Sequence, residues 1–499
     1  MSEFVLVCID DLPIHIGDGN YSAKYPKASE FVETGIPFIS ASDFSNGRIS
    51  SKDFRFISEE QHATLLKGHL KPGDVLVVTR GNGTGDVAWV DPEYDDCNIN
   101  AQLVLLRTDE VVVHNRYLYF LLSSKEYKEI LVSYSSGSAQ PQLPIRALKL
   151  VELRLPPYEQ QVKTAHILSS IDNKIELNRQ TNQILEQIAQ AIFKSWFVDF
   201  DPVKAKIIIK EKDGNELAQE LAAEAILCGA ITLEHLQTLD NTTATFEEQL
   251  YPLITTRFPN NAPENNNPNL WQPEQLAATA KLFPNAMVES ELGGIPEGWE
   301  AGSIGNLSRA RGGFAFKSKD FVDVGNPVVK IKNITGTGTV DIEGSQCISD
   351  QTAGNANRYK LRDGDLLMAM TGATVGKTGI VVVGNRDVYL NQRVAKFESD
   401  IFDSNVSWFL YCCFKREVVF DSIVGSAQGS AQPNIGSSGI EAAELVVPGK
   451  HCVSTFCDLV SPLFEKWISN FKENKTLEEI RNALLPKLLS GDLTLNNAG

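Results

Sequence analysis

An internal duplication is the feature that most constrains the fold of this chain. The stretch GSAQP begins at residue 137 and returns at residue 429, 292 positions later. Residues 70–90 (LKPGDVLVVTRGNGTGDVAWV) align with residues 361–381 (LRDGDLLMAMTGATVGKTGIV) without a gap. The identities include Gly73, Asp74, Leu76, Gly81 and Gly85 against Gly364, Asp365, Leu367, Gly372 and Gly376. Because such repeats mark copies of one structural unit, we expect two domains of the same fold.

Each copy carries short runs of β-branched and apolar residues, such as VLVV at 75–78 and LLMAM at 366–370, between turns rich in Gly, Asp and Asn. Runs of this kind predict strands of a small mixed domain.

A long helical pattern follows each copy, beginning near Pro156 and Pro448. Apolar or special residues recur there at alternating spacings of three and four, which is the seam of a coiled coil. The first seam comprises Leu168, Ile171, Ile175, Asn178, Asn182, Leu185, Ala189, Ile192 and Trp196. The second comprises Val460, Leu463, Trp467, Asn470, Asn474, Leu477, Arg481, Leu484 and Leu488.

Asparagines occupy the same two central positions of both seams, and a buried amide fixes the register in which two helices meet. Exposed asparagines on ordinary amphipathic helices are the alternative. Pro462 and Pro486 have no counterpart in the first helix, so an interruption is expected near both ends of the second.

These patterns predict an α+β chain with two pseudo-symmetric mixed α/β domains, separated by two long helices packed as an antiparallel coiled coil. The predicted boundaries are 1–154 for the first domain, 155–206 for the first helix, 207–288 for an acidic insertion, 289–447 for the second domain and 448–499 for the second helix.

The charge distribution does not decide the partner. The net charge is −17, but residues 207–295 alone hold 4 basic and 13 acidic side chains. More than half of the acidic excess therefore lies in one segment between the repeats. The architecture, with two related domains held apart by helices, instead suggests a long, twofold-like ligand such as duplex DNA. The acidic insertion is interpreted as an interaction tail or a flexible linker.

No targeting segment, membrane span or catalytic motif is apparent. The N-terminus lacks a secretory signal, which favours a cytoplasmic protein without a membrane partner. The eight cysteines show no metal-binding spacing, so no metal site is predicted. TGATVGKT (371–378) is one residue too short for a phosphate-binding loop, and Leu155 in LPPYE cannot accept a hydrogen bond from a flipped adenine.

Residues 155–206 resemble the central conserved region of the specificity (S) subunit of Type I restriction–modification systems. The segment AIFKSWFVDFDPVKAK (191–206) carries most of the likeness, and ESELGGIPEGWE (289–300) resembles the entry to the second target recognition domain. Two departures are the enlarged insertion at 207–282 and the second helix, which ends in LLPKLLSGDL without a KSWFVDFDP counterpart.

The resemblance implies a non-catalytic subunit in which each target recognition domain reads one half of a bipartite double-stranded DNA site and the helices set the gap. It also implies two methyltransferase (M) subunits that use S-adenosylmethionine to methylate adenines, and restriction (R) subunits that use ATP and Mg²⁺. No cofactor is expected in this chain. The alternatives are a protein-interaction scaffold, a methylation-only specificity subunit, and an enzyme with degenerate motifs, either a single-chain methyltransferase or a restriction–methylation fusion.

Two sets of residues are candidates for binding. Side chains that read bases or phosphates are expected in the glycine turns, in the basic stretch 309–319 and in GSAQP: Arg80, Asn82, Thr84, Gln140, Arg309, Arg311, Lys317, Thr374, Lys377, Thr378 and Gln432. A partner subunit would dock on the first helix at Ile184, Ile188, Phe193, Trp196 and Phe197. For the glycine turns and GSAQP, ordinary turn formation and close packing are the alternatives, and for the aromatic residues it is core packing.

Overall fold

The computed structural model describes residues 4–19, 25–50, 53–137, 141–258, 271–402, 405–426 and 433–493. The chain divides into two compact units, Met1–Leu177 with Asn474–Gly499, and Asn178–Glu473. Each unit contains one of the two repeats. No helix among these described segments is both long enough and apolar enough to cross a membrane.

The first repeat is built on a six-stranded sheet whose inner strand is the fully buried VLVV run. In spatial order the strands are β2 (Ile14–Asp18), β10 (Leu103–Thr108), β7 (Val75–Val78), β8 (Val87–Trp89), β5 (Arg48–Ile49) and β4 (Phe44–Ser45). A smaller sheet orders β6 (Phe56–Ile57), β3 (Ile36–Ile39) and β9 (Asn98–Ile99), and β1 (Val5–Cys8) pairs with β11 (Glu152–Leu155). The helices are α1 (Glu59–Thr64), α2 (Asn115–Ser123), α3 (Lys125–Ser133) and α4 (Ile145–Leu148).

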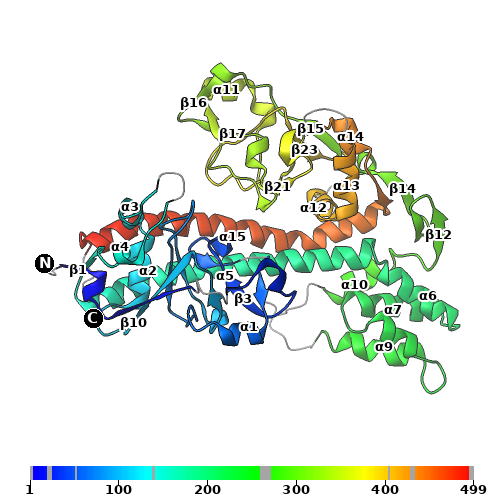
Figure 1. The fold of residues 1–499 in the computed structure, drawn as a ribbon. Coiled ribbons are helices and arrows are strands. Elements are labelled where there is room, and N and C mark those ends of the chain that lie inside the picture. The colour runs from blue at the N-terminus through cyan, green and yellow to red at the C-terminus, as the bar shows by residue number, and fades with distance from the viewer. Residues whose placement is uncertain are drawn as a thin grey trace, which may run out of the picture. The chain divides into compact units, whose positions relative to one another are not determined.

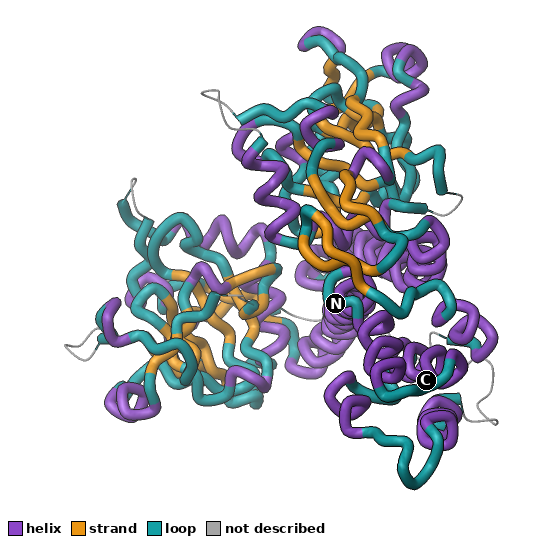
Figure 2. Tube along the Cα trace, turned by 90° about the vertical axis from the view of Figure 1, so that its right-hand side faces the viewer, coloured by secondary structure: helices purple, strands orange, loops and turns teal. Residues whose placement is uncertain are grey.

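The second repeat keeps this strand order, except that its main sheet has no counterpart of β4 and its second sheet has one additional strand. Its main sheet runs β15 (Arg309–Gly312), β23 (Val394–Glu398), β20 (Leu366–Ala369), β21 (Thr378–Ile380) and β18 (Gly338–Thr339). A second sheet orders β16 (Phe321–Val322), β19 (Gln346–Ile348), β17 (Asn326–Val329) and β22 (Tyr389–Leu390), and β14 (Glu300–Ser303) pairs with β24 (Glu444–Val447). The helices are α11 (Asp350–Asn355), α12 (Ser407–Phe414), α13 (Glu417–Gly425) and α14 (Ser437–Glu441). In each repeat the strands gather in one group with helices against it (Figure 2), which confirms the predicted duplication.

Two long helices, α5 (Tyr158–Phe197) and α15 (Lys450–Ser490), pass through both units (Figure 1). Within the first unit, the Asn474 side chain donates to the Ile175 carbonyl at 3.2 Å. Within the second, the Asn470 amide donates to Asn182 Oδ1 at 2.8 Å. Rising numbers on one helix meet falling numbers on the other, so both contacts confirm antiparallel pairing. All four seam asparagines are at most 6% exposed, and the alternative of solvent-facing amides is therefore wrong.

The predicted interruptions of the second helix are absent, because α15 continues from Lys450 to Ser490 through both prolines. Pro462 and Pro486 are both exposed. On that side of a helix, the carbonyl that loses its backbone partner can bond to water, so the helix tolerates each proline.

The described part of the acidic insertion folds into helices, so the expectation of a tail or flexible linker is wrong. The helices are α6 (Asp201–Glu211), α7 (Glu216–Leu227), α8 (Leu233–Thr238), α9 (Phe246–Thr255) and α10 (Pro273–Ala280), followed by the hairpin β12 (Met287–Ser290) and β13 (Gly293–Pro296). Apolar residues such as Leu221, Leu236 and Phe246 are buried in the core of the second unit. Side chains of Asn215, Thr232 and Thr245 cap three of these helices. The acidic residues lie mostly on the exposed faces of these helices. The net charge of the segment therefore reflects its surface and does not indicate the buried apolar faces.

Candidate nucleic-acid interface

A glycine turn joins the two inner strands of the main sheet in each repeat. Gly81 and Gly85 have φ angles of 93° and 89°, and their counterparts Gly372 and Gly376 have φ angles of 77° and 79°. Residues with a side chain rarely adopt this conformation, so the backbone itself requires glycine. At Gly81 the conformation alone is the reason, because a Cβ added there would meet nothing within 4 Å.

The same turn is hydrogen-bonded to the chain that follows GSAQ. In the first repeat, the Gly81 N–H donates to the Pro141 carbonyl at 3.1 Å and the Leu143 N–H donates to the Thr79 carbonyl at 2.8 Å.

The second repeat reproduces both bonds. The Gly372 N–H donates to the Pro433 carbonyl at 3.0 Å, and the Ile435 N–H donates to the Met370 carbonyl at 2.9 Å. We call residues 79–86 with 141–143, and residues 370–377 with 433–435, the turn–GSAQP junctions. GSAQP recurs because, in each copy, the carbonyl of its proline accepts a hydrogen bond from the first glycine of the turn. Gln140 and Gln432 lie outside the described residues.

The two junctions expose different side chains. The first presents Arg80, Asn82 and Gln142, and the second presents Lys377 and Asn434. Sequence reasoning missed Gln142 and Asn434, although carboxamides at matching places in QPQL and QPNI were the signal.

The predicted threonines of these turns point inward. Thr84 is 4% exposed, and its hydroxyl is hydrogen-bonded to the main-chain carbonyls of Gly81 (2.7 Å) and Pro141 (3.0 Å). Thr378 is 8% exposed within β21, and the half-buried Thr374 donates to the Ile331 carbonyl at 3.3 Å. Thr84 and Thr378 therefore stabilise the fold and do not offer their hydroxyls to a ligand.

The basic stretch 309–319 lies partly on β15, beside a hollow of about 500 Å³. Arg309 is held by Glu441 at 3.3 Å. The Arg311 side chain is exposed and makes no hydrogen bond or ion pair with any described residue, and Arg358 lines the same hollow. Lys317 is exposed further along the chain. Arg311 is thus the member of this stretch best placed to bind an anion.

Lys396, which lines this hollow, forms an ion pair with Asp365 at 3.1 Å. Burial raises the pKa of the Asp365 carboxyl, and the neighbouring Lys396 ammonium opposes that rise.

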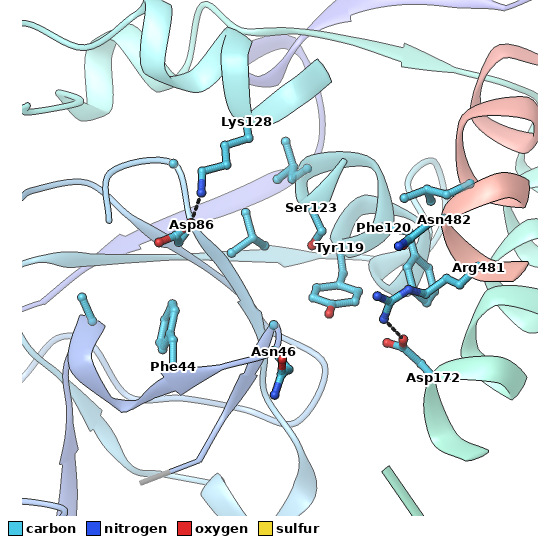
Figure 3. Close-up of a pocket in the computed structure, with 16 residues that line it drawn as sticks. Phe44, Asn46, Asp86, Tyr119, Phe120, Ser123, Lys128, Asp172, Arg481 and Asn482 are labelled. Atoms are coloured by element: carbon cyan, nitrogen blue, oxygen red, sulfur yellow. Dashed lines mark hydrogen bonds and ion pairs between the residues drawn. The ribbon is translucent and has the colours of Figure 1, made fainter. Parts of the chain in front are cut away.

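Charged side chains join the first repeat to the helix pair of its own unit, and Figure 3 shows one of them, Asp172, paired with Arg481. Asp172 on α5 accepts from Arg481 on α15 at 2.8 Å and from Arg116 on α2 at 3.2 Å. Arg116 also stacks on the rings of Trp89 and Tyr119. Burial lowers the pKa of the Arg116 guanidinium. A hollow of about 420 Å³ lies beside this network, lined by the β7–β8 turn, α2 and α15.

The second unit makes the corresponding attachment with different residues. Glu186 on α5 accepts from the Tyr411 hydroxyl at 2.8 Å and pairs with Lys415 at 3.0 Å.

The predicted partner-binding residues separate into two groups. Phe193, Trp196 and Phe197 are at most 4% exposed and pack in the core of the second unit, so they are not available to another subunit. The sequence shows that they are apolar but not which face of the helix the acidic insertion covers. Ile184 and Ile188 are 55% and 36% exposed. These two remain candidates.

The chain contains two copies of one α+β module, each attached to its own half of one antiparallel helix pair. Each copy presents the same turn, hydrogen-bonded to the GSAQP proline. This architecture defines a tandem recognition protein for a ligand with two related sites. The Type I restriction modification DNA specificity domain matches residues 1–187 and 296–451. The chain therefore belongs to this family and is a DNA specificity subunit of a Type I restriction–modification system.

Individual relatives agree. The Type I restriction enzyme HindI specificity subunit of Haemophilus influenzae is 31% identical over 445 residues, covering 86% of this chain and 88% of the relative. The MjaIX specificity subunit of Methanocaldococcus jannaschii is 25% identical and covers 95% of this chain and 90% of its own length. The crystal structure of the S subunit from M. genitalium matches 97% of this chain and 96% of its own, with a TM-score of 0.52 at 13% identity, which supports the fold.

Proposed function

We propose that this chain recognises a bipartite double-stranded DNA site, with each repeat reading one half and the helix length setting the gap. The observation that carries the proposal is the pair of turn–GSAQP junctions. Their main-chain hydrogen bonds are the same, while their exposed side chains differ. An asymmetric two-part DNA site requires two modules with the same backbone structure and with different side chains facing the bases.

The exposed groups suit the chemistry of DNA. Arg80, Lys377 and Arg311 carry the positive charge that binds phosphates. The carboxamides of Asn82, Gln142 and Asn434 suit adenine, whose major-groove edge offers one donor and one acceptor. The formal charge of −17 does not oppose this, since the acidic excess lies largely in the insertion.

The catalytic steps belong, in this proposal, to partner subunits. Two adenine methyltransferase (M) subunits would bring S-adenosylmethionine, and restriction (R) subunits would bring ATP and Mg²⁺. Ile184 and Ile188 support docking of a methyltransferase subunit, because they form an exposed apolar pair one helical turn apart on α5. This chain would supply DNA recognition and no catalytic group.

The decisive experiment is co-expression of the full chain with a methyltransferase subunit from the same organism, followed by single-molecule mapping of methylated adenines. The expected result is one bipartite motif with a fixed gap. A chain in which residues 300–440 are replaced by the corresponding domain of another specificity subunit should change only one half of the motif. That replacement keeps the helices intact, so it avoids the folding problem of a deletion.

Two outcomes would contradict the proposal. A stable complex that methylates no bipartite motif would favour the protein-interaction scaffold. A domain replacement that changes both halves would show that the repeats do not read DNA separately.

A further inference from the structure

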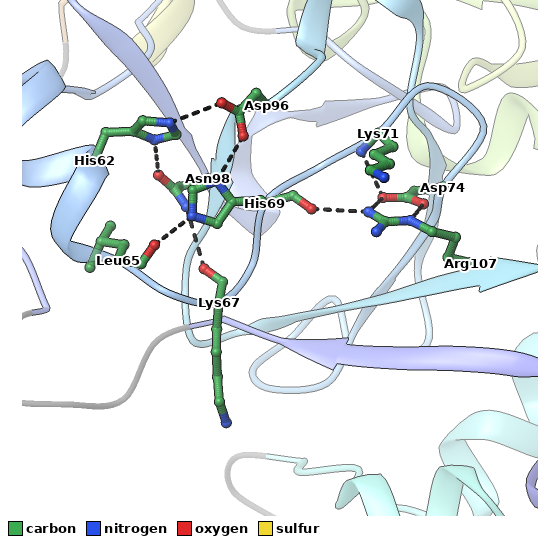
Figure 4. Close-up of polar contacts among 9 residues, drawn as sticks. All are labelled: His62, Leu65, Lys67, His69, Lys71, Asp74, Asp96, Asn98 and Arg107. Carbon is green, nitrogen blue, oxygen red and sulfur yellow. Dashed lines mark hydrogen bonds and ion pairs between the residues drawn. The ribbon is translucent and has the colours of Figure 1, made fainter.

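Two histidines and an aspartate of the first repeat converge at one point (Figure 4). His62 lies on α1, His69 follows that helix, and Asp96 precedes β9. His62 Nε2 lies 3.2 Å from Asp96 Oδ2, and His69 Nδ1 lies 2.7 Å from Asp96 Oδ1. One ligand atom from each of the three residues falls within 4.8 Å of the other two. We propose that His62, His69 and Asp96 bind one divalent transition-metal ion of the Zn²⁺ type.

The distances are close to those of a metal site. Ligands about 2.1 Å from a tetrahedral ion lie roughly 3.4 Å from one another, so a small side-chain adjustment suffices. Two imidazole nitrogens and one carboxylate favour zinc and its neighbours over Mg²⁺ or Ca²⁺, which prefer oxygen ligands.

The far side of each ring supports this assignment. His62 Nδ1 donates to the Asn98 side-chain oxygen, and His69 Nε2 donates to the Leu65 carbonyl. Metal-binding histidines are typically oriented by such acceptors on the ring nitrogen that does not face the metal. With those nitrogens carrying the hydrogens, the nitrogens that face Asp96 have lone pairs for a cation.

The site is partly open. The His62 and His69 side chains are 14% and 34% exposed, whereas Asp96 is 69% exposed. Three protein ligands at a surface leave a coordination position for water. The bound ion would tie α1 and the loop after it to the strand that begins at Asn98.

The second repeat provides an internal comparison. The isolated bridge between residues 69 and 98 corresponds to the bridge between Lys360 and Tyr389. On this register Lys360 takes the place of His69, Asp387 that of Asp96, and Ala353 that of His62. Lys360 and Asp387 form an ion pair at 2.7 Å. The second repeat therefore has an ion pair at this point and no side chain that could replace the His62 imidazole as a metal ligand, so the proposed metal site belongs to the first repeat alone.

The test uses the untagged full chain, freed of metal with a chelator and titrated calorimetrically with Zn²⁺. We expect one ion per chain. His62→Ala and His69→Lys introduce the residues of the second repeat, so both variants should fold, and each should weaken zinc binding at least about tenfold. His235→Ala removes an exposed histidine outside the site and should leave binding unchanged. The Co²⁺ absorption spectrum should lack thiolate charge-transfer bands, which separates this site from the free cysteines.

The proposal fails if the chain shows no saturable zinc binding, or if His62→Ala and His69→Lys bind zinc as tightly as the unmodified chain. Thermal unfolding of metal-free variants checks folding independently. Because the probe is the metal alone, these outcomes do not depend on DNA recognition.

Discussion

Asn182 and Asn470 are buried amides on the helix seam, and their mutual hydrogen bond forms in one register only. Asn182 also donates to the Trp467 carbonyl at 3.1 Å. A buried polar pair contributes more to specificity than to stability. Asn470 Oδ1 illustrates this, because it is buried and has no hydrogen-bond partner in the described parts of the chain.

We expect Asn470→Ala to lower the free energy of unfolding by about 1–3 kcal/mol, because Asn182 Oδ1 is left buried without a donor. Urea denaturation followed by circular dichroism measures the change. The exposed Glu465 on the same helix is the control, and its replacement by alanine should cost less than about 0.5 kcal/mol. The double variant Asn182→Leu/Asn470→Leu should recover most of the loss, since neither polar group then remains buried. Equal stability of Asn470→Ala and the unmodified chain would contradict the assigned role of the pair.

Asp172 forms ion pairs with the guanidinium groups of Arg116 and Arg481, and the Arg116 side chain is only 8% exposed. Asp172→Ala leaves that charge buried without a carboxylate, and we expect a loss of about 3 kcal/mol. Arg481→Ala should cost less, because the Arg481 side chain is 28% exposed and water replaces its partner. Differential scanning calorimetry should rank the two variants in this order.

The surface pair of Lys125 and Glu129 serves as the reference for this ranking. Both side chains are more than two-thirds exposed, so Glu129→Ala should change stability by less than about 0.5 kcal/mol. If Asp172→Ala were equally mild, the buried network would not be what fixes the first repeat to its helix pair.

At the scale of elements, the sequence predicted what depends on local pattern. The strands, the helices and the seam follow from periodicity, which is carried by neighbouring residues. The turn–GSAQP junction could not be predicted, because Pro141 bonds to a glycine 60 positions earlier. The inward orientation of the Thr84 side chain could not be predicted for the same reason, since its hydroxyl donates to the Pro141 carbonyl.

The junctions yield a prediction about salt dependence. If Arg80 and Lys377 each bind a phosphate, Arg80→Ala and Lys377→Ala should each reduce the slope of log affinity against log salt by about one. Affinity for duplex DNA should fall several-fold at low salt, as measured by fluorescence anisotropy on the complex with its methyltransferase subunit. Lys125→Ala, which removes an exposed charge of the same repeat outside the turn–GSAQP junction, is the matched control. An unchanged slope in both variants would remove these side chains from the interface.

At the scale of the whole chain, the two helices are the elements that both units share. α5 has 40 residues and α15 has 41, and each passes from one unit to the other near its middle, at 177–178 and 473–474. The heptad seam predicted this pairing, because its period is carried by each helix alone. Helices α7 to α10 were not predicted, since composition averaged over an acidic segment conceals a short helix with one buried face.

Helix length should therefore control the gap in the recognised DNA. Inserting one heptad after residue 177 and a matching heptad after residue 473 keeps the seam in phase in both helices. Seven residues add about 10 Å of helix, and a base pair rises about 3.4 Å, so the gap should lengthen by at most about three base pairs. The two half-sites should stay the same, because neither recognition module changes. Single-molecule mapping of methylated adenines reads both properties at once. A four-residue insertion in α5 alone puts the seams out of phase and should reduce methylation instead of moving the half-sites. An unchanged gap in the double-heptad chain would show that the helices do not measure the DNA.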